Sequence, residues 1–561
     1  MLGLSEINMK EFGPLREELL SEQNESWVLP PELYSCWNAR GLYNPLQFVL
    51  RLRPDIHKEL DSIAPGIKSS SDLTFPLVQA FSTYFHETIH WWQHVGSTYG
   101  LLSSLIYPAQ AHINKNYLIE ILEDIGPYKP ILGLDSNLTL IKSDRTRQNI
   151  NKVLNNWHDI EFFRRLTIDP KKAPSVLNSP YFECQGHSYN MSWSSVLWLI
   201  ASTFDSEFSV IPDIRLWESE FDKLKKKKVE GYYYGSRVVL SPIGAREIFE
   251  GQARISQIQY LFLASGGHLN WKEFSELGML EGVYKEAFDH FLKIIGAPWP
   301  SNPNDPLVGL FLLVCDISIN PTDGFPFNIY HFDSFVISVD PGMRFLELSM
   351  IIRDKIPNLK SSVQKYSKDE YLEVSEVLCK NLVCHTPHSA AVEFNRWSEI
   401  HSPFIKLLEE DESFKFSPEN LPVRVFFARF LLFQKDKIKT PEFFCWPGVW
   451  TTGVHAGDIE LAQSEILFEK HRAIFVDRED GDVYPRTFEE KDEKSVLETF
   501  NSFYSWCSIY ELTRQWIVNN GEFDFNFLWL TSKYSQEQVT DWASDNFEKT
   551  FGVDPRSFKI T

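Results

Sequence analysis

Residues 85–94 read Phe85-His86-Glu87-Thr88-Ile89-His90-Trp91-Trp92-Gln93-His94 and contain the pattern His-Glu-x-x-His. Side chains four residues apart on a helix lie on one face, one turn from each other. His86 and His90 can therefore direct two imidazole nitrogens at one metal ion. Glu87 follows the first of these ligands and lies beside the metal, where a base takes a proton from metal-bound water. The pattern predicts a metal site with Glu87 as the catalytic base.

The residues around this pattern favour a helix. Pro76 suits the first turn of a helix, and the chain from Leu77 to Tyr99 contains no further proline and only one glycine, Gly96. We therefore expect one helix over residues 77–99. The alternative interpretation is a half-exposed helix that carries its two histidines by chance.

A catalytic zinc site needs a third protein ligand, because the fourth position belongs to water. The sequence predicts a second helix that starts near residue 241, with Ser241 as N-cap and Pro242 in the first turn. Glu250 lies in the middle of this otherwise apolar helix. A buried carboxylate is costly unless it is paired or bound to a metal. Glu250 is therefore the predicted third ligand, and an ion pair with Arg254 at i,i+4 is the alternative.

Glu247 competes with Glu250 for this role, because residues three apart share roughly one helix face. Two arguments favour Glu250. It lies deeper in the helix, next to Gly251, where we expect a close approach to the first helix. Glu247 lies near the helix start, where the macrodipole already favours an acidic residue. If neither glutamate binds metal, His94 and His187 are the next candidates.

The two segments together resemble a known family. His86-Glu87-Thr88-Ile89-His90 and the run Phe249-Glu250-Gly251-Gln252-Ala253 are similar to the zincin metallopeptidases of the gluzincin type, in which a later Glu-Gly-x-Ala helix completes the site. The resemblance implies a zincin-like catalytic core and one Zn²⁺ ion bound by His86, His90 and Glu250. It covers these two helices only. The metzincin variant is excluded, because Gly96 occupies the position of its third histidine.

Composition limits the remaining function classes. The chain has 561 residues, which is too long for one core. Of these residues 43% are hydrophobic and 23% are charged, a composition typical of a folded protein. A net charge of −21 argues against binding to nucleic acid. Seven scattered cysteines are typical of reduced thiols. No secretory signal is visible, and the longest apolar runs are too short to span a membrane. We expect a cytoplasmic protein with no membrane contact.

The domain prediction depends on one proline-rich segment. Residues 296–306 contain four prolines, which interrupt both helix and strand. We expect an α+β, helix-rich protein with a zincin-like domain over 1–297, interrupted by an insertion around 125–235, and a mainly helical C-terminal domain over 307–561. Residues 1–45 are expected to be an irregular lead-in. Residues 48–53 alternate apolar and basic side chains after Leu50 and predict a strand with one wet face.

The predicted function is hydrolysis of a protein or peptide substrate by a zinc-dependent peptidase. The large C-terminal region is a candidate binding surface for a regulatory protein partner. A non-catalytic, zincin-shaped interaction protein is the alternative, because catalysis leaves most of the chain unexplained. A second metal site at Cys379, Cys384, His385 and His388 is also conceivable, but their spacing matches no standard zinc module.

Overall fold

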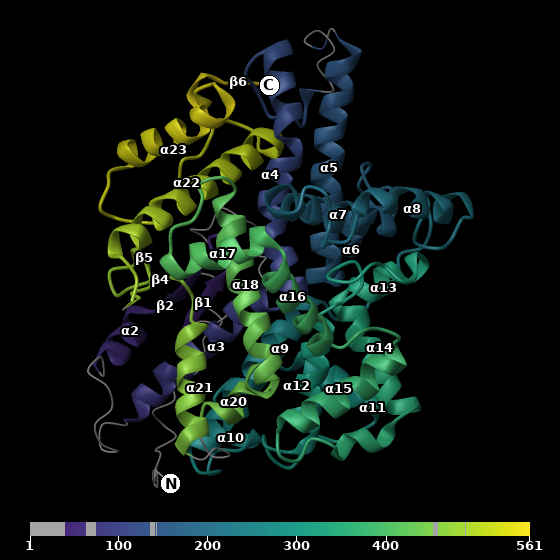
Figure 1. Cartoon of the computed structure of the whole chain (residues 1–561), viewed down its shortest axis with the longest axis vertical. Helices are drawn as coiled ribbons and strands as arrows, with labels where there is room; N and C mark the ends of the chain where they lie inside the picture. The colour runs from purple at the N-terminus through teal and green to yellow at the C-terminus, as the bar shows by residue number, and fades with distance from the viewer. Residues whose placement is uncertain (1–39, 63–73, 135–140, 142, 453–457, 489) are drawn as a thin grey trace.

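Helices dominate the computed structural model, which describes residues 40–62, 74–134, 141, 143–452, 458–488 and 490–561 (Figure 1). Short strands are the minor component, so the α+β, helix-rich class is confirmed. Residues 1–39 of the predicted lead-in lie outside the described residues. The end of that lead-in was predicted wrongly, because Gly41–Asn44 form a strand, β1.

One small sheet joins two distant parts of the chain. Its strand order is β1-β2-β4-β5, where β2 is Val49–Leu52, β4 is Phe475–Asp477 and β5 is Val483–Pro485. β1 and β2 are antiparallel, β2 and β4 are parallel, and β4 and β5 form an antiparallel hairpin. The predicted strand at residues 48–53 is therefore confirmed as β2. Residues near the end of the chain thus complete a sheet that begins near residue 41.

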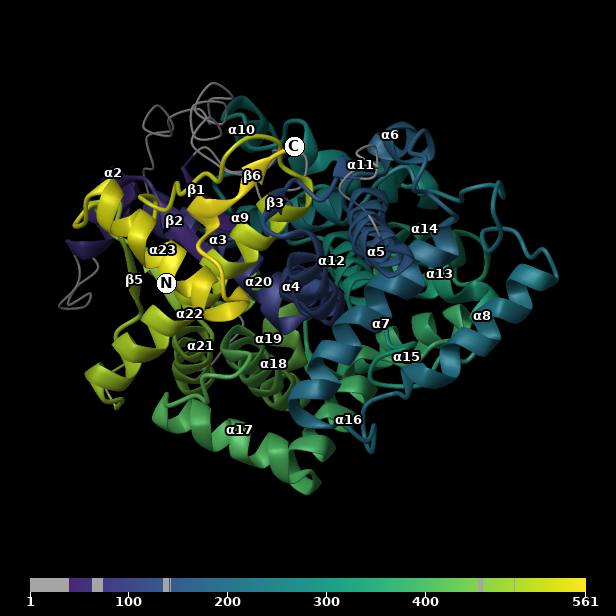
Figure 2. The same ribbon diagram turned by 90° about the horizontal axis from the view of Figure 1, so that it is seen from above.

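The helix that carries the two histidines is α3, Phe75–Gly96. The side chain of its N-cap residue, Thr74, accepts a hydrogen bond from the backbone N–H of Leu77, and Pro76 lies in the first turn, as the sequence predicts. Helix α9, Ala245–Ala264, lies beside α3, and β1 also contacts α3, as Figures 1 and 2 show. Because α3 has neighbours on more than one side, its histidines are removed from water.

Helix α3 ends earlier than predicted, because a sharp bend separates it from α4, Thr98–Ile125. Ser97 at the bend is extended, and its hydroxyl accepts a hydrogen bond from the backbone N–H of Gly100 and donates one to the carbonyl of Gln93. A Cβ atom at Gly100 would lie 1.8 Å from the Gln93 carbonyl oxygen. The bend therefore depends on the Ser97 cap and on the absence of a side chain at Gly100. No proline marks it in the sequence.

Helix α9 also begins later than predicted. Its N-cap is Gly244, so the prediction of Ser241 as N-cap was wrong. A Cβ atom at Gly244 would lie 2.4 Å from the carbonyl oxygen of Ile168. The start of α9 is therefore fixed by close packing against the end of α5, Asp144–Ile168, which local sequence does not reveal.

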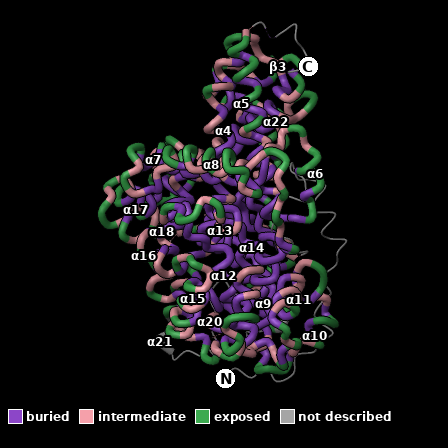
Figure 3. The backbone as a smooth tube through the Cα atoms, turned by 90° about the vertical axis from the view of Figure 1, so that its right-hand side faces the viewer, coloured by how far each residue is buried: buried purple, intermediate pink, exposed green. Residues whose placement is uncertain are grey.

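Two hydrophobic clusters hold the described residues together. The larger one extends from Leu42 to Cys507, and the smaller one joins α4 and α5 to α22, Glu493–Val518, and α23, Gln536–Phe551. In Figure 3 the buried positions fill the middle of the molecule, and α4, α5 and α22 form the narrower part above it. Residues 296–305 connect two helices that both contribute to the larger cluster, and a division into two domains there stays a prediction.

The other helices surround these elements. Before residue 297 they are α2 (Pro54–Asp61), α6 (Ala173–Leu177), α7 (Gln185–Phe204), α8 (Trp217–Lys226), α10 (Trp271–Glu276) and α11 (Val283–Ile295). After it they are α12 (Pro306–Ile319), α13 (Phe335–Val339), α14 (Pro341–Asp354), α15 (Lys368–Leu382), α16 (Pro387–Ile400), α17 (Ser402–Ser413), α18 (Leu421–Lys439), α19 (Pro441–Cys445), α20 (Pro447–Trp450) and α21 (Asp458–Lys470). A two-stranded sheet pairs β3 (Tyr128–Lys129) with β6 (Lys559–Ile560).

Candidate metal centre

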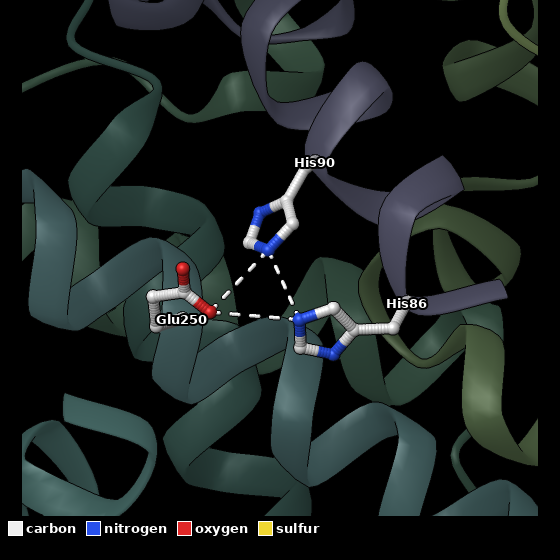
Figure 4. Close-up of side chains that lie close together, drawn as sticks. All are labelled: His86, His90 and Glu250. Atoms are coloured by element: carbon white, nitrogen blue, oxygen red, sulfur yellow. Dashed lines mark hydrogen bonds and ion pairs between the residues drawn. The ribbon is translucent and has the colours of Figure 1, made fainter. Parts of the chain in front are cut away.

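Three side chains from two helices converge in the interior. His86 and His90 project from successive turns of α3, and Glu250 projects toward them from α9 (Figure 4). The two Nε2 atoms lie 3.1 Å apart, and Glu250 Oε2 lies 3.5 Å from that of His86 and 3.4 Å from that of His90. All three side chains are completely buried. They form a group that could hold a metal ion.

The spacing of the three atoms fits a tetrahedral metal site. Nitrogen and oxygen ligands bind zinc at about 2.0–2.2 Å, which places tetrahedral ligands about 3.3–3.6 Å apart. The observed separations of 3.1, 3.4 and 3.5 Å are close to this range. One shared proton can satisfy only one of these three contacts, whereas one cation satisfies all of them. The donor set therefore fits a single metal ion with three protein ligands.

The charges of the three groups also suit a metal. Burial lowers the pKa of His86 to about 3, because the charged imidazolium is poorly solvated there. Burial alone would raise the pKa of Glu250, but the two adjacent imidazoles prevail and lower it to about 2. At neutral pH the group therefore offers an uncharged His86 imidazole and a carboxylate, the forms that bind metals.

Gln93 orients His90 and connects the two helices. The Nδ1 atom of His90 donates to Gln93 Oε1 at 2.7 Å, and Gln93 Nε2 donates to the Phe249 carbonyl at 3.0 Å and to Gln252 Oε1 at 2.9 Å. Because the amide of Gln93 donates to α9, its oxygen must face His90. The Nδ1 atom of His90 therefore carries the proton, and Nε2 presents its lone pair to the centre of the group. No role was predicted for Gln93, although its position three residues after His90 places the two side chains within reach of each other on the helix.

Glu87 lies beside this group and against the sheet. Its side chain is completely buried, and a Cβ atom at Gly41 of β1 would lie 2.7 Å from its Cγ. Burial, helped by the charge of Glu250 and opposed by His90 and Arg254, raises the pKa of Glu87 to about 8. Because Gly41 has no side chain, the carboxyl group of Glu87 fits against β1.

Arg254 and Tyr284 are two neighbours of the centre that the prediction did not include in the site. The guanidinium of Arg254 lies 4.1 Å from the centre of the Tyr284 ring, and that ring lies 6.3 Å from the ring of His86. Arg254 is only 1% exposed. The alternative of an ion pair between Glu250 and Arg254 is not present among the described residues. The i,i+4 spacing drew attention to Arg254, whereas nothing in the sequence singled out Tyr284.

The other candidates have different partners. Glu247 Oε2 accepts from the backbone N–H of Gly244 at 2.8 Å, so Glu247 caps α9 and does not point at the group. His94, a fallback ligand candidate, is buried between Tyr43 and Phe249 and is not part of the group. His187, the other fallback candidate, lies on α7 and pairs with Asp159 at 3.2 Å. Gly251 packs against Ala287 of α11, so the predicted approach of Gly251 to α3 was wrong.

The cluster of Cys379, Cys384, His385 and His388 does not form a second metal group within the described part of the chain. None of the helices that the structure describes is both long enough and apolar enough to cross a bilayer. No family model, no curated protein and no solved structure matches this chain.

Proposed function

We propose that this chain is a zinc-dependent peptidase with a zincin-like core. The observation that carries the proposal is the convergence of His86, His90 and Glu250 at tetrahedral spacing, with Glu87 one residue from the first ligand. A zinc ion held there would polarise a peptide carbonyl and lower the pKa of water. The resemblance of the two helices to gluzincins supports the same assignment.

Glu87 would act as the base in this reaction. Its carboxylate would take the proton of the attacking water and then pass it to the leaving amine, so that no free charge is left on either group. With a pKa of about 8 before any cation is bound, Glu87 is close to the range in which a group both accepts and returns a proton near neutral pH. A cation at the three ligands favours its ionised form.

Tyr284 is a candidate donor to the oxyanion of the tetrahedral intermediate. Burial and the neighbouring carboxylate of Glu250 raise the pKa of Tyr284 above its ordinary value, so the phenol keeps its proton. A hydroxyl donor held in a water-poor site stabilises developing negative charge more than it would in water.

The test combines metal content with hydrolysis of a peptide library. The purified chain should contain close to one zinc ion per molecule. Glu87→Gln should keep that zinc and lose about 100- to 10,000-fold in hydrolysis, because only the base is removed. His86→Ala should lose both metal and activity. If Glu87→Gln loses its metal as completely as His86→Ala, the assignment of Glu87 as base is wrong.

The alternative function, an interaction protein with a structural metal, is favoured by one observation. His86, His90, Glu250 and Glu87 are all completely buried. Structural zinc sites are closed, whereas catalytic sites keep an open position for water. A chain that holds zinc, cleaves no library peptide and unfolds when a chelator removes the metal would support this alternative.

A further inference from the structure

Arg254 is a buried cation on the same helix face as a metal ligand. It follows Glu250 by four residues on α9, so the two side chains lie one turn apart. Its guanidinium stacks on Tyr284, which also contacts the ring of His86. The positive charge of Arg254 acts on His86 and on Glu87. Arg254 is therefore a neighbour of both the predicted metal ligands and the predicted base.

The guanidinium has one acceptor for Nη1 and also interacts with the side chain of Tyr284. Nη1 donates to Gln257 Oε1 at 2.5 Å, and Gln257 Nε2 donates to the hydroxyl of Ser82 on α3 at 3.1 Å. Nε and Nη2 have no hydrogen-bond acceptor among the described residues. Leaving two buried donors of a charged group unsatisfied is unfavourable. This edge is therefore available to an acceptor from outside the described residues.

The unoccupied edge is the one that other arginines of this chain use to bind carboxylates. Arg514 donates from Nε and Nη2 to the two oxygens of Glu511, at 3.0 and 2.6 Å. Arg53 uses the same two atoms for Asp55, at 2.9 and 2.8 Å. These parallel donors match the two oxygens of one carboxylate. Arg254 presents the same edge to no carboxylate within the described residues.

We infer that the Nε and Nη2 atoms of Arg254 bind a carboxylate of the substrate, next to the bond that is cleaved at the metal centre. This inference rests on the proposed function and names its substrate class. Because Arg254 lies one helical turn from Glu250, the carboxylate belongs within about one or two residues of the scissile bond. A peptide offers two sources of it, the C-terminal carboxylate and the side chain of an aspartate or glutamate.

Binding can be tested without catalysis. The probes are N-acetyl-leucine and its amide, which differ only in the carboxylate, titrated by calorimetry into the zinc-loaded Glu87→Gln chain. The acid should bind about 10- to 100-fold more tightly than the amide, as expected for charged hydrogen bonds. Arg254→Met should reduce this ratio to near one, and Arg254→Lys should retain part of it. Arg246→Met, on the same helix, is the matched control and should leave the ratio unchanged.

Peptide cleavage identifies the source of the carboxylate. The wild-type chain is given one peptide with a free C-terminus, its C-terminally amidated form, and an amidated form with one internal glutamate, and the products are identified by mass spectrometry. Cleavage only of the free form assigns the C-terminal carboxylate. Cleavage of the amidated glutamate peptide beside that residue assigns the side chain.

Two results would overturn the inference. One is equal binding of the acid and the amide to the Arg254-containing chain, a result that does not depend on whether Arg254→Met folds. The other is an equal loss of affinity for the acid and the amide in Arg254→Met. That result would mean that Arg254 contacts a group that both probes share, such as the peptide carbonyl, and not the carboxylate. Selective acid binding without any hydrolysis would instead count against the proposed peptidase function and leave carboxylate binding by Arg254 standing.

Discussion

Two buried carboxylates in this molecule have opposite surroundings. Glu511 on α22 accepts four hydrogen bonds, from Tyr107 at 2.6 Å, from Arg514 at 2.6 and 3.0 Å, and from Gln515 at 2.9 Å. Glu250 on α9 has no hydrogen bond to either oxygen and faces two imidazole nitrogens at 3.4 and 3.5 Å. Both side chains lie in the interior.

The difference lies in the balance of donors and acceptors. Around Glu511, each lone pair in use is matched by an N–H or O–H group, so the cluster needs nothing from outside. Around Glu250, the facing atoms are the Nε2 atoms of two imidazoles, of which that of His90 is an acceptor, and a cation satisfies all three atoms together. A buried polar cluster with matched groups stabilises the fold, whereas one with an excess of acceptors indicates a ligand.

The largest expected effect separates the two glutamates of α9. Glu250→Ala should weaken zinc binding by about 3–5 kcal/mol, roughly a one-ligand share of the affinity typical of zinc sites. Glu247→Ala should leave zinc affinity unchanged and cost about 1 kcal/mol in stability, because Glu247 caps the helix. Competition with a chromophoric chelator measures the affinities. The reverse order would make Glu247 the ligand.

Substitution in the cluster around Glu511 should lower the stability of the protein and leave its zinc affinity unchanged. Arg514→Met leaves the Glu511 carboxylate buried without its cation, which should lower the free energy of unfolding by about 3–5 kcal/mol. Chemical denaturation and hydrogen exchange of α22 measure the loss. The double variant Glu511→Gln/Arg514→Met should recover part of it, because both charges are gone. A drop in zinc affinity in Arg514→Met would show that the two clusters are coupled.

A smaller effect is expected at the group that orients His90. Gln93→Met removes the acceptor of the His90 Nδ1 proton and should weaken zinc binding about 10- to 100-fold. Gln252→Met is the matched control, because it removes one partner of the Gln93 amide without touching His90. If both variants bind zinc equally well, the orientation of His90 does not depend on this amide.

The smallest expected effect concerns the fit of Glu87 beneath β1. Gly41→Ala places a methyl group only 2.7 Å from Glu87 Cγ, so one of the two must shift. Overpacking of this kind costs about 1–3 kcal/mol. Because Glu87 is the displaced group, we expect slower peptide hydrolysis with zinc content unchanged. Unaltered hydrolysis in Gly41→Ala would mean that β1 moves to accommodate the methyl group.

The sequence predicted those parts of the site that depend on one helix at a time. The spacing of His86 and His90 and the place of Glu250 within a helix follow from local periodicity, and the structure brings these residues together. The start of α9 could not be predicted, because it is fixed by the contact of Gly244 with the end of α5. Arg254 was noticed only as a possible partner of Glu250, and its unoccupied edge is visible only in three dimensions.

The short strands were also beyond prediction, except for β2. Strands of three or four residues carry little periodic pattern, and β4 pairs with the distant strand β2, while β5 pairs with β4. The predicted function, its substrate and the proposed location in the cytoplasm stay predictions. The six cysteines of the described residues are free thiols.

The parallel pairing of β2 with β4 sets the order in which the protein can be assembled during synthesis. The backbone N–H of Leu52 donates to the Asp477 carboxylate across a separation of 425 residues. At a translation rate of about 5–20 residues per second, roughly 20–85 s pass between the synthesis of these two partners. Nascent chains therefore contain His86, His90 and Glu87 long before the sheet next to Glu87 is complete. Late completion of this sheet delays the finished site until almost the whole chain has left the ribosome.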